Sequence, residues 1–117
     1  RTNYSNPPIH GGAVVAAVLG TPALRAQWEQ ELAVMRERIK EMRTLLVEKL
    51  KAAGVKQDMS FITSQIGMFS YSGLTKDQMV RLRNEFAVYG TDTGRMCVAA
   101  LNTKNIDYVC ASIAKVI

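Results

Sequence analysis

Arg95 is the residue whose type and position most directly suggest chemistry. It follows a Thr93-Gly94 turn signal and opens an apolar stretch that ends at Ala100, a pattern typical of a short strand. A guanidinium at the mouth of such a strand offers two parallel N–H donors, which match the two oxygens of a carboxylate or a phosphate. The same position also suits an arginine that ends a strand in solvent or in a structural ion pair, and position alone favours this second interpretation.

No catalytic set accompanies this arginine in the sequence. The single histidine, His10, has no partner pattern for a triad, and a metal site would need further ligands. Glycine-rich phosphate-binding patterns are absent as well. The two cysteines, Cys97 and Cys110, lie on apolar stretches without metal-ligand spacing, and we interpret them as reduced core residues of a cytoplasmic protein. The sequence therefore predicts neither catalytic residues nor a metal site in this chain.

The charge pattern argues against nucleic acid as a partner. Of fifteen basic residues in the 117-residue chain, seven lie between residues 22 and 53, where five glutamates accompany them. No basic stripe is interleaved with aromatic side chains, as binding of a single strand would require, so the net charge of +5 indicates a solvated face of mixed charge. The longest apolar run, Ala13 to Leu19, is far shorter than the ~20 residues that cross a bilayer, so no membrane partner is expected.

A long amphipathic helix is predicted over residues 21–54. Thr21 suits the N-cap, Pro22 the first helical position and Gly54 the stop. The apolar stripe advances by three or four residues through Leu24, Trp28, Leu32, Met35, Ile39, Met42, Leu46 and Leu50. A helix of about 32 residues is ~48 Å long, whereas a compact domain of this size has a radius of gyration of roughly 13 Å. We therefore expect the helix to span two domains or to lie along a partner.

Beyond residue 59 the pattern changes to short alternating segments that read β-β-α-β-β-α. The expected strands are 59–65, 68–72, 88–91 and 96–100. Thr75 and Gln78 form a capping box for the first helix of this region, and Asn102 or Thr103 suits the N-cap of the last one. The predicted architecture is an α+β layer of two helices on a small sheet.

Two features suggest that the chain is part of a larger protein. It begins at Arg1 rather than at an initiator methionine. Residues 12–19 are apolar on every side, so a helix there would be buried all round, yet a chain of this size has little with which to cover it. We expect the covering residues to belong to another part of the complete protein.

Three sequence strings in a fixed order carry a family resemblance. The strings YSNPPIHGG, GMFSYSGLT and TGRMCVAALNTKN, with the long helix between the first two, resemble the C-terminal part of the class I, fold-type I aminotransferases of aspartate and aromatic amino acids. The resemblance covers Arg1 to Ile117. It implies an α/β enzyme whose large domain holds pyridoxal phosphate and whose small domain combines both chain ends. Residues 1–20 would end the large domain, 21–54 would form the linking helix and 55–117 would belong to the small domain.

The resemblance also implies roles for individual residues. Arg95 matches the arginine that binds the substrate α-carboxylate, and Phe69 matches an aromatic residue that lines the substrate pocket. Arg1 matches the arginine that reaches across a homodimer to the distal carboxylate of aspartate or glutamate, with Ser5 and Asn6 as the cross-subunit pair beside it. Two cationic anchors would orient the Cα–H bond over the cofactor, which serves as the electron sink.

The reacting groups of such an enzyme are not expected in this chain. None of its lysines lies in the family's motif for the lysine that binds pyridoxal phosphate, and the phosphate cup should lie upstream. We therefore expect no catalytic and no cofactor-binding residue here, and no activity of the chain alone.

The substrate preference is expected to be dual. The string GRMCVAALN favours the aromatic-type enzymes, whereas Asn6 favours the aspartate type. The complete enzyme would move an amino group between an aromatic or acidic L-amino acid and 2-oxoglutarate. An alternative from another class is a free-standing, non-catalytic interaction module that uses the long amphipathic helix to bind a partner.

Overall fold

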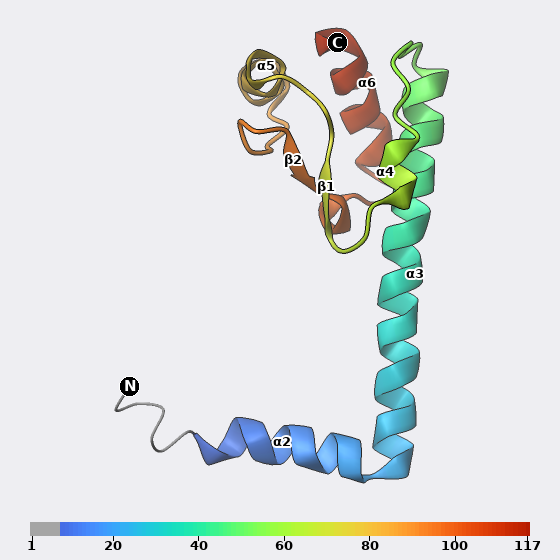
Figure 1. Ribbon diagram of the computed structural model, residues 1–117, viewed down its shortest axis with the longest axis vertical. Coiled ribbons are helices and arrows are strands. Elements are labelled where there is room, and N and C mark those ends of the chain that lie inside the picture. The colour runs from blue at the N-terminus through green and yellow to red at the C-terminus, as the bar shows by residue number, and fades with distance from the viewer. Residues whose placement is uncertain (1–7) are drawn as a thin grey trace. The chain divides into compact units, whose positions relative to one another are not determined.

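The computed structural model describes residues 8–117, which form mostly helices and one small sheet (Figure 1). The elements in chain order are α2 (Ile9–Gly20), α3 (Pro22–Ala52), α4 (Phe61–Ser64), β1 (Phe69–Tyr71), α5 (Lys76–Phe86), β2 (Arg95–Cys97), the 3-10 helix η1 (Val98–Ala100) and α6 (Ile106–Val116). The chain divides into two compact units, and the division falls inside α3, between Arg36 and Glu37.

Helix α3 confirms the predicted long helix, with ends within two residues of those expected. It begins at Pro22, and Arg25 N–H donates to Thr21 O at 2.9 Å. At the other end Gly54 has a φ of +87°, and the N–H of Val55 donates to Leu50 O at 3.1 Å. This pattern is a Schellman stop, in which a left-handed glycine lets the last carbonyls find donors. Local signals therefore account for both ends of the helix.

The first unit leaves its apolar residues uncovered. Helix α2 forms as expected over the apolar segment, but none of its residues is buried within the described chain. The first four stripe residues of α3 are likewise exposed, at between 43% and 57%, and they are Leu24, Trp28, Leu32 and Met35. No single described helix is long and apolar enough to cross a membrane. Helices α2 and α3 together reach the length and apolar composition of a membrane span, but the chain bends by 97° between them.

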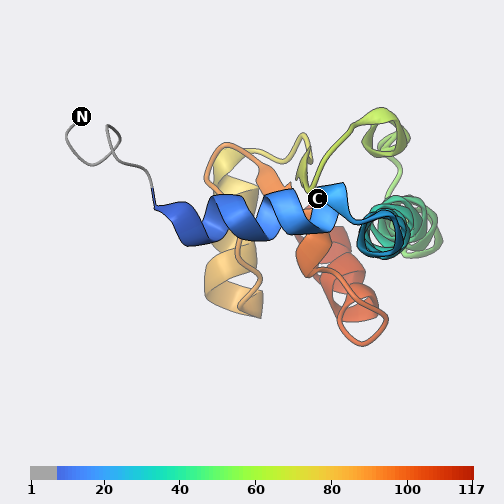
Figure 2. The same ribbon diagram turned by 90° about the horizontal axis from the view of Figure 1, so that it is seen from below.

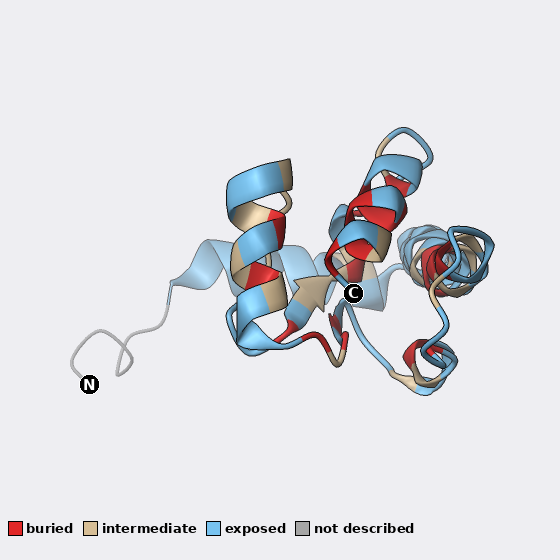
Figure 3. Ribbon diagram, turned by 90° about the horizontal axis from the view of Figure 1, so that it is seen from above, coloured by how far each residue is buried: buried red, intermediate tan, exposed pale blue. Residues whose placement is uncertain are grey.

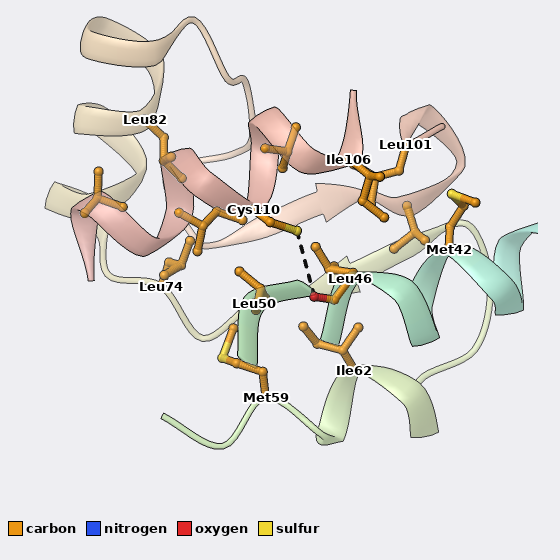
Figure 4. Packing of buried hydrophobic residues seen from close by; sticks show 14 of the residues in the cluster. Met42, Leu46, Leu50, Met59, Ile62, Leu74, Leu82, Leu101, Ile106 and Cys110 are labelled. Carbon is orange, nitrogen blue, oxygen red and sulfur yellow. Dashed lines mark hydrogen bonds between the residues drawn. The ribbon is translucent and has the colours of Figure 1, made fainter. Parts of the chain in front are cut away.

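The second unit holds the hydrophobic core. The later stripe residues of α3, which are Met42, Leu46 and Leu50, are buried against residues of α4, α5 and α6 (Figure 4). Figure 3 colours the buried residues of the ribbon red. Helices α5 and α6 lie side by side (Figure 2). Burial of apolar area stabilises a fold by about 25 cal/mol per Å². The second half of α3 is therefore held against the other elements of the second unit by hydrophobic packing.

The sheet is smaller than predicted. It has two antiparallel strands, and β1 faces β2 with Phe69 opposite Cys97, Ser70 opposite Met96 and Tyr71 opposite Arg95. The predicted β-β-α-β-β-α order is therefore wrong. The strand expected at 96–100 ends at Cys97, because the chain then turns into η1, where Leu101 N–H donates to Val98 O.

Two predicted strands are absent from the described residues. The segment 59–65 contains helix α4, because Met59 and Ile62 lie three residues apart and both turn into the core. The segment 88–91 is irregular, because Ala87 adopts a left-handed conformation that ends α5.

The capping predictions gave mixed results. The capping box of Thr75 and Gln78 is present. The last helix, however, begins at Ile106 after Asn105. Asn102 instead accepts hydrogen bonds from the N–H groups of Lys104 and Asn105, so it forms the turn that precedes the helix rather than its cap.

We predict that the stability of the second unit depends on the buried part of the α3 stripe. Leu46 is 0% exposed, so Leu46→Ala should lower the free energy of unfolding by about 2–5 kcal/mol through lost burial and a residual cavity. Leu24 belongs to the same stripe but is 44% exposed in the 117-residue chain by itself, so Leu24→Ala in that chain should cost at most about 0.5 kcal/mol. Urea unfolding of the two variants measures the difference, and equal losses would contradict this description of the core.

We predict a loss of stability at alkaline pH that comes from Cys110. Burial raises the pKa of this thiol from its ordinary 9.0 to about 11. The folded state therefore holds a proton that the unfolded state releases, so the contribution is complete below pH 9 and disappears as the pH rises to about 11. Unfolding measured between pH 8 and pH 11 should show this slope in the wild type. Cys110→Ala should flatten it, and an unchanged slope would refute the assignment.

Candidate substrate-binding site

The turn before β2 fixes the backbone of Arg95. Gly94, with a φ of +86°, donates its N–H to Thr91 O at 2.9 Å. The N–H of Thr91 donates to Arg95 O at 3.0 Å, and Thr91 Oγ1 accepts the N–H of Arg95 at 3.1 Å. On the other side, Gly94 O accepts from the backbone N–H and from the hydroxyl of Ser72 at 2.8 and 2.7 Å. The first residue of β2 is thus held from both directions.

The side chain of Arg95 lies exposed over an aromatic ring. Its Cζ is 5.0 Å from the centroid of the Phe69 ring, within the range of a cation–π contact. Among residues 8–117, no carboxylate forms an ion pair with this guanidinium. The described part of the chain therefore does not use Arg95 as a structural ion-pair partner, and its N–H donors remain available to an anion.

A shallow cavity of about 230 Å³ opens beside this pair. It is lined by Phe69, Tyr89, Gly90, Thr91, Arg95, Met96 and Cys97. Complete ligand pockets usually measure about 300–1,000 Å³. The cavity is smaller than this range, and its lining combines the cation of Arg95 with the aromatic face of Phe69.

The structure brings together two of the five predicted site residues. Arg95 and Phe69 come from adjacent strands and meet at the cavity. Arg1, Ser5 and Asn6 lie outside the described residues.

Tyr89 and Thr91 belong to the cavity lining but were not among the predicted site residues. Both lie in the segment expected to be a strand, and both line the cavity. The available signal was their closeness to the turn that opens β2.

Helix α3 holds the segment that follows β2. Arg38 donates from Nη1 to Leu101 O and from Nη2 to Ala99 O, each at 2.7 Å. The fork of the guanidinium thus caps two carbonyls of the turn around η1. This contact ties the end of β2 to the helix.

Similarity to known proteins agrees with this geometry. The model of the family "Aminotransferase class I and II" matches residues 1–113. The chain therefore belongs to the class I and II aminotransferases, and the predicted resemblance is confirmed.

Individual relatives narrow the similarity to two enzyme types. The chain is 57% identical to the aspartate aminotransferase of Pseudomonas aeruginosa, over 100% of this chain and 29% of that protein. It matches the crystal structure of the aromatic-amino-acid aminotransferase of Burkholderia pseudomallei, covalently bound to pyridoxal phosphate, at 66% identity and a TM-score of 0.95, over 99% of this chain and 29% of that one.

A further relative links the two substrate types. This is the psychrophilic aromatic amino acid aminotransferase of Psychrobacter sp. B6, cocrystallised with aspartic acid, at 47% identity and a TM-score of 0.93. The match covers 99% of this chain and 29% of that structure. The chain thus spans less than a third of the length of these relatives.

The described residues alone do not fit the pyridoxal cofactor. Covalent attachment of its aldehyde needs a lysine amine, and no lysine lines the cavity beside Arg95. The same part of the chain contains no cluster of three or more metal-ligating side chains. The cavity wall can therefore bind and orient an anion, and a bound cofactor would have to be held by residues outside it.

We predict that Gly94, in the turn before Arg95, tolerates alanine less well than Gly54 does. A Cβ at Gly94 would lie 2.9 Å from Leu74 O, whereas a Cβ at Gly54 would meet nothing within 4 Å. Both glycines have positive φ, so each alanine variant pays roughly 1–2 kcal/mol for its backbone conformation. Gly94→Ala should destabilise the chain by more than Gly54→Ala because of the added clash. Urea unfolding compares the pair, and equal losses would contradict the prediction.

Proposed function

We propose that the complete protein containing this chain is an aminotransferase that uses pyridoxal phosphate. It would move an amino group between an aromatic or acidic L-amino acid and 2-oxoglutarate. One observation carries the proposal for this chain: the Arg95 guanidinium, which has no ion-pair partner among the described residues, lies over Phe69 at a cavity in a member of the class I and II aminotransferases.

Arg95 would bind the α-carboxylate that all these substrates share. Its two N–H donors would match the two carboxylate oxygens and set the plane of that group. Phe69 lies against the guanidinium and would restrict its orientation. Fixing the carboxylate orients the substrate Cα–H bond, which is how binding energy becomes positioning.

Arg1 would bind the second carboxylate of an acidic substrate. We place it, with Ser5 and Asn6, at the subunit boundary of a homodimer, where it would serve the site of the partner subunit. Support comes from the motif around YSNPP and from an aromatic aminotransferase relative that was cocrystallised with aspartic acid. This arrangement would let one enzyme accept acidic and aromatic side chains.

The cofactor would be supplied by the rest of the protein. Pyridoxal phosphate, as in the Burkholderia relative, provides the electron sink for the reaction when it is bound. The residues of this chain would bind, orient and enclose the substrate, and the chain alone would be inactive.

The domain organisation follows the same proposal. Residues 1–20 would end the large domain, 21–54 would link the domains and 55–117 would belong to the small domain. The exposed apolar residues of α2 and of the first half of α3 support large-domain residues as their cover. The two free cysteines support a cytoplasmic location for the enzyme.

We predict that substitution of Arg95 affects all substrates of the complete enzyme, whereas substitution of Arg1 affects mainly the acidic ones. Arg95→Leu should lower kcat/KM for aspartate and phenylalanine alike, by at least about 100-fold, because every substrate loses its α-carboxylate partner. Arg1→Leu should reduce turnover of aspartate much more than that of phenylalanine. Steady-state kinetics with both substrates measure the two patterns.

Arg81→Leu is the control for these variants. Arg81 forms an exposed ion pair with Glu85 on α5, away from the cavity lining, so its loss should leave both activities near wild type. Retained activity of Arg95→Leu would refute the proposed site. Equal losses on both substrates in Arg1→Leu would refute the role assigned to Arg1.

A further inference from the structure

Arg43 is a buried arginine without a carboxylate partner. It is 3% exposed, and no described carboxylate forms an ion pair with it. Its guanidinium donates to Ile62 O at 3.1 Å, to Ser70 Oγ at 2.9 Å, to Gly67 O at 2.6 Å and to Phe69 O at 2.8 Å. Burial also lowers the pKa of this guanidinium. A buried cation is costly unless it is fully hydrogen-bonded. The hydrogen bonds of Arg43 with the residues around β1 therefore offset the cost of burying its charge.

Two of the four atoms that accept from Arg43 lie at, or just before, the open edge of β1. Successive carbonyls of an extended strand point in opposite directions. The carbonyl of Met68 points toward the segment after β2, where it accepts the N–H of Val98 at 2.8 Å. The carbonyl of Phe69, the first residue of β1, therefore points the other way, where residues 8–117 provide no further strand, and the carbonyl of Gly67 belongs to the bend just before β1. Nη2 of Arg43 binds both of them and takes the place of that missing neighbour.

The side chain of Gln65 occupies the same edge of β1 at Tyr71, two residues beyond Phe69. Its side-chain oxygen accepts the N–H of Tyr71 at 2.9 Å, and its side-chain nitrogen donates to Tyr71 O at 3.2 Å. The amide thus pairs with Tyr71 as a strand residue would. The hydroxyl of Ser70 joins the two side chains, because it accepts from Arg43 and donates to Gln65.

The strands need this support because each has only three residues. An isolated two-stranded hairpin is marginal in water, and a shift of one residue in register moves every side chain to the other face. Phe69 lies against Arg95 only while β1 keeps its register with β2. The side chains that occupy the open edge of β1 therefore also set the geometry of the site.

We propose that Arg43, together with Gln65, is a positioning residue for substrate binding. The pair holds β1 so that the Phe69 ring lies under the guanidinium of Arg95. This inference rests on the proposed role of Arg95 as the carboxylate anchor. It assigns to helix α3 a function in the site beyond its place in the core.

The test uses the complete enzyme and the variant Arg43→Lys. Lysine keeps the charge but lacks the planar fork that spans several acceptors. We expect the dissociation constant for maleate, an unreactive dicarboxylate, to rise about tenfold. The KM values for aspartate and phenylalanine should rise by about the same factor. This effect is smaller than the roughly hundredfold loss that a misplacement of about 1 Å can cause. The kcat per folded enzyme should change much less. Calorimetry and steady-state kinetics measure these quantities.

Two further variants separate positioning from a loss of folded protein. Ile113→Val removes one methylene from the core on α6, far in sequence from β1, and it should lower the melting temperature while KM and maleate affinity stay at wild-type values. Gln65→Ala removes the pairing with Tyr71 and the acceptor of the Ser70 hydroxyl but leaves Arg43 unchanged, and it should raise KM in the same direction as Arg43→Lys, by about threefold.

The maleate affinities and KM values of these variants decide whether Arg43 and Gln65 position the site. Wild-type maleate affinity and KM in folded Arg43→Lys and Gln65→Ala would overturn the proposal, and so would an equal rise in Ile113→Val. Arg95→Leu is measured in parallel. If that variant keeps its affinity for maleate, the proposed function fails, whereas a loss there with no change in Arg43→Lys refutes only the role of Arg43.

Discussion

The contacts between the arginines of α3 and the backbone carbonyls around the sheet are the constraint on which the site depends. Arg43 binds the outer edge of β1, and Arg38 binds the turn after β2. The two arginines lie five residues apart on one helix, so a single rigid element holds both β1 and the turn after β2. Two strands of three residues cannot supply this rigidity themselves.

Guanidinium groups suit this task because of their shape. A planar fork can donate to several carbonyls at once, and a neutral amide such as Gln65 can pair with only one residue of a strand. The positive charge of Arg43 is distributed over three carbonyl oxygens and one hydroxyl rather than neutralised by a carboxylate. Among residues 8–117, the charge of Arg43 is therefore accommodated without an ion pair.

The parts of the fold that were predictable from sequence are those with local causes. Both ends of α3 and the capping box at Thr75 follow from residues within a few positions of one another. Helix α4 was mistaken for a strand because four residues are too few for a helical period to show. Arg43 looked like part of a solvated charged face, since its acceptors lie 19 to 27 residues away and three of the four are backbone carbonyls, which have no sequence signature. Position alone favoured a structural role for Arg95, and only its surrounding motif led to the prediction that it binds a carboxylate.

Core packing and site geometry are coupled because α3 supplies both. Met42 and Arg43 are consecutive residues, and both are buried, one against the core and the other against the edge of β1. The apolar stripe fixes the rotation of the helix about its axis, since Leu46 and Leu50 must face the core. That rotation in turn decides where Arg43 points. The amphipathic pattern of the long helix therefore does more than bury area: it aims the guanidinium that sets the register of β1, and through Phe69 it determines the surface on which Arg95 rests.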